Sequence, residues 1–163
     1  MAERNSGWRR PAVLCCSTLV ATMLAAGAAH AALLGTCTIT ILSGGTLGHD
    51  AAIDTLGSRE AGGSAARVQV KANSVICTVL GLLDCYRVSA PPPAAFGAYP
   101  PGGGGGVAFS SSYSIDGGPD IAGTTQTEVL NGTYSIAVDL AADRASGIFP
   151  AGTYQAQVTV RCE

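Results

Sequence analysis

Cysteines have the clearest chemistry in this 163-residue chain, and there are six of them. Two of these, Cys15 and Cys16, lie in an N-terminal segment that we expect to be removed on export. Four then remain: Cys37, Cys77, Cys85 and Cys162. An even number of cysteines in an exported chain favours disulfides, and four cysteines permit three pairings. We favour Cys37–Cys162, which closes nearly the whole mature chain, together with Cys77–Cys85, which closes a short hairpin.

The other residues give little support for a metal site or for a catalytic nucleophile. A zinc site needs clustered ligands, whereas the mature chain has one histidine, His49, and no C-x-x-C motif. His49 and Asp50 have the residue types of a serine hydrolase, but Gly62-Gly63-Ser64-Ala65-Ala66 is not a G-x-S-x-G elbow and lies in a predicted loop. We therefore expect His49 to be an exposed turn residue and the protein not to be an enzyme.

The acidic side chains are spread over predicted turns and wet strand faces, where solvated carboxylates are usual. Asp116 and Asp120 flank Gly117-Gly118-Pro119 and are weak candidates for a calcium site, although this pattern is typical of a bare turn. The single tryptophan is lost with the N-terminal segment, so stacking on sugars would fall to tyrosine and phenylalanine. A small secreted glycan- or calcium-binding module is the alternative function, and we expect no cofactor.

The N-terminus has the three regions of a secretory signal peptide. Arginines at positions 4, 9 and 10 precede an apolar run from Val13 to Ala26, and Ala29-His30-Ala31 is an A-x-A cleavage site. The run is too short and too rich in alanine for a membrane span. We expect residues 1–31 to be removed and residues 32–163 to form one domain, exported to the periplasm, the cell surface or the medium. Lipoprotein processing at Leu34-Gly35-Thr36-Cys37 is an alternative, although the position before the cysteine favours a smaller residue than threonine.

Charge is sparse throughout the sequence. Asp, Glu, Lys and Arg together make up 12% of the chain, and the net charge is −2. Removal of residues 1–31 takes away three arginines and one glutamate, which leaves six basic and ten acidic side chains. A mildly acidic surface with one lysine is a poor partner for nucleic acid or anionic lipid. Glycine-rich chains with few charges are common among extracellular β-proteins.

Both ends of the mature chain alternate as half-buried strands do. From Thr36 to Leu42 a cysteine and two isoleucines alternate with three threonines, and Gly152 to Cys162 alternates in the same way. Because each strand carries a cysteine in phase with its apolar side chains, we expect the first and last strands to meet. The predicted core contains Ile39, Ile41, Ile136, Val138, Val158 and Val160.

Further strands are predicted between these ends, each bounded by turn residues. They cover Ala66–Ala72, Val75–Leu80, Cys85–Ser89, Val107–Ile115, Thr124–Leu130 and Thr133–Leu140. Asn131-Gly132 predicts a hairpin between the last two of these strands, and Ala141–Ala145 is expected to form one short helical turn. This succession of short strands indicates a single antiparallel, immunoglobulin-like β-sandwich with Greek-key connections.

Two connections have unusual composition. Ala90 to Gly106 contains three consecutive prolines and five consecutive glycines, which predicts a mobile surface connection within one domain. The tip at Leu80, Leu82 and Leu83 is apolar, whereas loop tips are normally polar. It either folds back onto the edge of the sandwich or forms an exposed contact for a partner or a membrane surface.

Two short motifs at the chain ends resemble a known family. Pro150-Ala151-Gly152-Thr153-Tyr154, followed by Val158-Thr159-Val160, resembles the closing strand of bacterial surface proteins of the spore-coat-protein-U type and of related chaperone–usher pilins. Cys37-Thr38-Ile39-Thr40-Ile41, after an export signal, resembles their opening strand. The resemblance implies an incomplete immunoglobulin-like sandwich, filled by a strand that a chaperone and then a neighbouring subunit donates.

Two features depart from that family. A donor strand needs roughly ten residues at about 3.3 Å each, yet only Ala32 to Thr36 precede Cys37 after the expected cleavage. Pilins of the commoner type carry an aromatic residue near the C-terminus, where this chain has Cys162. We therefore expect an exported structural or adhesive surface protein, either a terminal pilus-like subunit or a self-complete relative that does not polymerise. Its partner would be another copy or a pilus-like neighbour, bound through a sheet edge.

Overall fold

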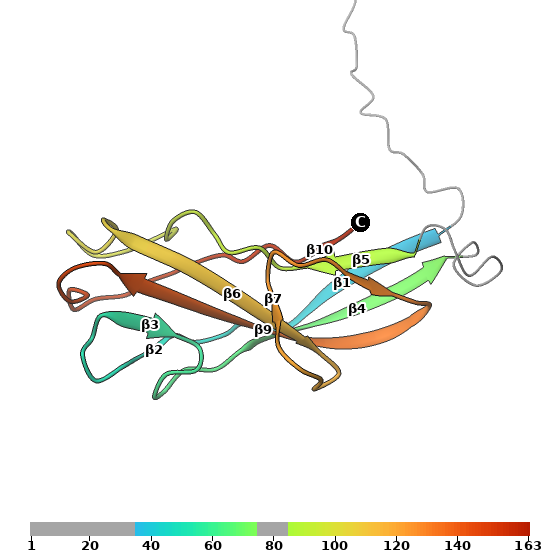
Figure 1. The fold of residues 1–163 in the computed structure, drawn as a ribbon, viewed down its shortest axis with the longest axis horizontal. Coiled ribbons are helices and arrows are strands. Elements are labelled where there is room, and N and C mark those ends of the chain that lie inside the picture. The colour runs from blue at the N-terminus through green and yellow to red at the C-terminus, as the bar shows by residue number, and fades with distance from the viewer. Residues whose placement is uncertain (1–34, 75–84) are drawn as a thin grey trace, which may run out of the picture. The chain divides into compact units, whose positions relative to one another are not determined.

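The computed structural model describes residues 35–74 and 85–163, and the structural statements below refer to these two ranges. Within them the chain forms ten β-strands and no helix, and the strands pair antiparallel (Figure 1). The predicted all-β class is therefore confirmed. The expected signal peptide, the predicted strand at Val75–Leu80 and the leucine tip lie outside the described residues.

The strands form two sheets. The larger sheet contains β1 (Gly35–Ser43), β2 (Gly48–His49), β3 (Thr55–Gly57), β4 (Ala66–Ser74), β6 (Val107–Ile115), β7 (Ile121–Ala122) and β9 (Gly132–Arg144). Its order is β1-β4-β9-β3-β2, with β6 paired to β9 and β7 paired to β6. The smaller sheet contains β5 (Tyr86–Ser89), β8 (Thr127–Val129) and β10 (Arg161–Cys162), in the order β10-β5-β8.

Strand β9 is the centre of the larger sheet and is longer than the sequence predicted. It pairs with β4, then with β3, along one edge and with β6 along the other (Figure 1). The helical turn expected at Ala141–Ala145 is therefore wrong, because Ala141 pairs with Gly57 on one side and with Ser110 on the other. Pairing on both edges overrides the weak helix preference of a short alanine-containing segment.

The hairpin predicted at Asn131-Gly132 is also wrong. Strand β8 pairs with β5 in the smaller sheet, whereas β9 belongs to the larger sheet, so the chain crosses between sheets at this point. The Asn131 carboxamide fastens the crossing to the end of β4, since it accepts a hydrogen bond from Ser74 N at 2.6 Å and donates one to Ser74 O at 2.8 Å. A hairpin forms instead between β6 and β7, where Asp116 and Gly117 have φ of 50° and 73°.

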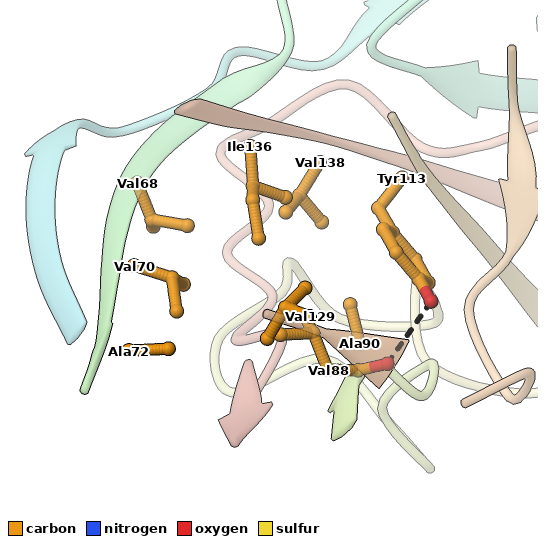
Figure 2. Close-up of a cluster of buried hydrophobic side chains, with 9 residues drawn as sticks. All are labelled: Val68, Val70, Ala72, Val88, Ala90, Tyr113, Val129, Ile136 and Val138. Atoms are coloured by element: carbon orange, nitrogen blue, oxygen red, sulfur yellow. Dashed lines mark hydrogen bonds between the residues drawn. The ribbon is translucent and has the colours of Figure 1, made fainter. Parts of the chain in front are cut away.

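The main core lies between the two sheets (Figure 2). Residues of the larger sheet contribute Val68, Val70, Ala72, Tyr113, Ile136 and Val138, and the opposite side contributes Val88, Ala90 and Val129. The Tyr113 hydroxyl lies 3.0 Å from Val88 O and 2.7 Å from Thr127 Oγ1. Tyr113 is fully buried, so its hydroxyl links the sheets by hydrogen bonds inside the apolar core.

A second cluster surrounds Phe96, which lies in the proline- and glycine-rich connection. Phe96 is 6% exposed and contacts the rings of Phe109, Phe149 and Tyr154, with centroids 4.8 to 6.2 Å apart. Gly97 N also donates a hydrogen bond to Gln155 O at 2.7 Å. The connection is thus anchored at its centre, and the mobility expected for Ala90–Gly106 stays a prediction.

Replacement of Tyr113 by phenylalanine should destabilise the domain. The substitution removes the hydroxyl that serves Val88 O and Thr127 Oγ1, and an unsatisfied buried acceptor costs about 1–3 kcal/mol. Chemical denaturation should show this loss in the free energy of unfolding. The matched change Tyr99→Phe, at a half-exposed ring, should have a much smaller effect. Equal stabilities of the two variants would contradict the role given to the buried hydroxyl.

Candidate functional site

The candidate site lies where the edges of the two sheets come together. Strand β1 ends one sheet and β10 ends the other. The disulfide Cys37–Cys162, predicted from the sequence, is confirmed and joins these two edge strands with a Cα–Cα distance of 6.3 Å. Cys85 is also disulfide-bonded, and its expected partner Cys77 lies outside the described residues. The two edges are therefore covalently connected at one end.

The segment before β10 was predicted to be a continuous strand, and the structure confirms its alternation but not its pairing. Side chains of one parity from Tyr154 to Cys162 are partly buried, and those between them are exposed. Gln155 is bridged to Ala98, and β10 pairs with β5. Between these points, residues 156–160 make no backbone hydrogen bond to any described residue. We call residues 154–160 the unpaired tail, because apart from the Gln155–Ala98 bridge they have no backbone partner among the described residues.

A groove of about 890 Å³ lies between β1 and the unpaired tail. One wall contains Ile39, Ile41 and Ser43 of β1, and the other contains residues 153–160. The floor consists of side chains from β4 and β9, namely Ala66, Val68, Val138 and Leu140. The turn from Gly44 to Leu47, with Ser58 and Ser64, completes the lining. Both walls are therefore backbone edges, and the floor is apolar.

The prediction that Ile39 and Ile41 belong to the buried core is wrong. Ile39 is 37% exposed and Ile41 is 77% exposed, because both lie on the groove wall and no described residue covers the groove. Val158 and Val160 on the facing wall are only partly buried. The other two predicted core residues, Ile136 and Val138, are buried as expected. Ile39 and Ile41 are thus exposed on the side where the two sheets end.

None of the described residues that line the groove carries a charged side chain. The nearest charge network lies behind Ser58, whose hydroxyl donates to Asp139 Oδ1 at 2.6 Å and accepts a hydrogen bond from Leu140 N. Arg59 forms ion pairs with Asp139 at 2.9 Å and with Asp120 at 2.7 Å. Hydrogen bonding to the Arg59 guanidinium holds the pKa of Asp120 below its usual value. This network fixes the loop beside the groove and leaves the groove itself neutral.

The weak calcium candidates are engaged in other contacts. Asp120 is paired with Arg59, and Asp116 Oδ1 accepts a hydrogen bond from Ser135 N at 2.7 Å. Within residues 35–74 and 85–163, no group of three or more His, Cys, Asp or Glu side chains is placed to hold a metal ion. Asp120 connects the β6–β7 hairpin to the β3–β4 loop through Arg59, and Asp116 connects the hairpin to β9 through Ser135 N.

The residues considered for hydrolase chemistry also form local contacts. His49 Nδ1 lies 2.9 Å from the main-chain oxygen of Asp50. The Asp50 carboxylate accepts hydrogen bonds from the N–H groups of Thr55, Ala52 and Asp54, which lower its pKa. The Ser64 hydroxyl pairs with Thr46 Oγ1 at 2.8 Å. None of these three side chains is hydrogen-bonded to another, so the described geometry does not assemble a triad.

The sequence predicted the alternating residues that form the two walls of the groove, but it did not predict that a groove separates them. The predicted first strand contains Ile39 and Ile41, and β1 confirms it. Val158 and Val160 alternate as predicted, but they lie outside β10, which covers only Arg161–Cys162. The floor residues Ala66 and Leu140 were not singled out, since an apolar side chain beneath a groove has the same pattern as one beneath a strand. The sequence signal that was available is the absence of charge and proline in the first strand.

The described residues contain no helix that is long and apolar enough to cross a membrane. The chain was also compared with protein-family models, curated proteins and solved structures. None of these comparisons found a match.

Proposed function

We propose that this chain is an exported, non-enzymatic structural or adhesive surface protein, resembling a pilus subunit. In this proposal its fold is an immunoglobulin-like Greek-key sandwich that lacks one strand. The observation that carries the proposal is the groove, because two backbone edges without a partner among the described residues face each other across an apolar floor. A backbone edge leaves N–H and C=O groups without partners, and an added strand supplies them.

The composition of the two edges supports this function. Long edge strands are usually protected by charged residues, proline or bulges, which prevent pairing with other chains. Strand β1 has nine residues without charge or proline, and its register is irregular only near its end, between Ile41 and Ser43. The unpaired tail also lacks charge. Edges of this kind are suited to acquire a strand rather than to avoid one.

The occupant that fits the groove is an extended segment of a neighbouring subunit. Its backbone would pair with β1, with the unpaired tail, or with both, which is the β-augmentation mode of recognition. Its inward side chains would be apolar, because they would contact Val68, Val138 and Leu140. Its inward positions would also be uncharged, since no lining residue could neutralise a buried charge.

The chain is proposed to accept such a strand rather than to donate one. After the expected cleavage at Ala31, only Ala32, Leu33 and Leu34 precede β1. A donated strand as long as the wall from Tyr154 to Val160 needs about seven residues at roughly 3.3 Å each, more than this segment supplies. An acceptor of this type would occupy the end of an assembly or bind a different subunit.

A single lysine in the groove should block strand binding. Ile41 lines the groove, whereas the next residue, Leu42, is 56% exposed and does not line it. The probe is a capped peptide that alternates valine and threonine over seven residues, with lysines beyond flexible glycines for solubility. We expect the peptide to bind oxidised residues 32–163, which form a compact unit of their own, and to raise the melting temperature.

The matched pair of variants is Ile41→Lys and Leu42→Lys. Both remove an exposed apolar side chain from β1 and add the same charge, so their stabilities without peptide should be similar. Peptide binding, measured by calorimetry, should weaken at least about tenfold in Ile41→Lys and remain close to wild type in Leu42→Lys. Absence of binding to the wild type, or equal effects of both lysines, would contradict the proposed function.

A further inference from the structure

We infer that the Cys37–Cys162 disulfide is a stop at one end of the groove, and that it fixes the length and the register of an inserted strand. This inference rests on the proposed function, because it concerns the same groove. It gives the disulfide a role in recognition besides its role in stability.

The distance between the two edges at the disulfide is too short for an intervening strand. Neighbouring strands in a sheet lie about 4.8 Å apart, so two strands on either side of a third lie roughly 9.6 Å apart. The Cα atoms of Cys37 and Cys162 are 6.3 Å apart and are covalently connected through their side chains. A strand that pairs with both walls must therefore end before it reaches this pair.

The opposite end of the groove has no such connection. It is lined by the turn that contains Gly44 and Gly45 and by Thr153 of the facing wall. A Cβ atom added at Gly44 would have no heavy atom within 4 Å, so the space around this residue is open. An inserted strand can extend past Gly44, and any residues in excess of the groove would emerge here.

The wall that limits the strand is the unpaired tail from Tyr154 to Val160. Its seven residues correspond to about 23 Å of extended chain at roughly 3.3 Å per residue. A strand that begins at the disulfide would therefore pair over about seven residues and would direct three or four side chains toward the floor. Its residue nearest the disulfide would lie beside Ile39 and Val160.

A series of peptides of different length tests whether the disulfide limits the length of the inserted strand. We use capped peptides that alternate valine and threonine over five, seven, nine and eleven residues. With wild-type protein, affinity should rise about tenfold from five to seven residues and change less than about twofold beyond seven. With the double variant Cys37→Ala, Cys162→Ala, affinity should continue to rise through nine residues, because the edges can then separate.

A second measurement uses only the wild-type protein, since loss of this disulfide can unfold the domain. Hydrogen exchange is followed by NMR on the labelled eleven-residue peptide bound to oxidised protein. We expect protection of about seven consecutive residues, with the exchanging residues at one peptide end only. Protection of nine or more residues, or exchanging residues at both ends, would overturn the inference.

The outcomes separate the inference from the function on which it rests. If no peptide of any length binds, the proposed function fails and the stop fails with it. If peptides bind but the wild-type affinity continues to rise through eleven residues, the groove accepts a strand and the disulfide does not stop it. If affinity depends on peptide length in the same way in the wild type and in the folded double variant, the disulfide does not limit the strand. The proposed function would then remain intact.

Discussion

Backbone hydrogen bonding at the edges of the two sheets is the constraint on which the rest of this structure depends. Inside the larger sheet, β4 and β9 are paired on both sides, so their backbone groups are satisfied. Strand β1 is paired only with β4, and residues 156–160 are not paired with any described residue. The two sheets therefore end on the same side with backbone groups that no described residue pairs, and a disulfide joins these ends at one point. The groove follows from this arrangement.

The groove can exist without an occupant because the remaining contacts hold the two sheets in place. Tyr113 connects the sheets through hydrogen bonds inside the main core, and Phe96 packs against Phe109, Phe149 and Tyr154 in the second cluster. The ring of Tyr154 belongs to both the second cluster and the groove wall. One end of the unpaired tail is thus fixed by aromatic packing and the other by Cys162. A wall fixed at both ends loses little conformational entropy when a strand binds, which favours binding.

The chemistry of the groove restricts what can bind there. The described lining residues carry no charge, the floor is aliphatic, and the walls offer main-chain donors and acceptors. Recognition of this kind depends on an extended backbone and on the alternation of inward side chains. Charged groups lie outside the groove, where Arg59 and Asp139 hold the loop beside it. These properties support the proposed pairing of the groove with an extended polypeptide segment.

Local patterns in the sequence were enough to predict the all-β class, the first strand, the alternation near the C-terminus and the Cys37–Cys162 disulfide, because periodicity and the phase of the cysteines depend on neighbouring residues. The pairing of the strands, in contrast, depended on contacts between distant parts of the chain. Asn131 binds the end of β4 instead of turning a hairpin, and Ala141 is held in a strand by partners distant in sequence. Alternation also predicted that Ile39 and Ile41 share one face, but it could not show that no described strand covers this face. The exposure of this face depends on where the two sheets end in space, and a local sequence pattern contains no information about that.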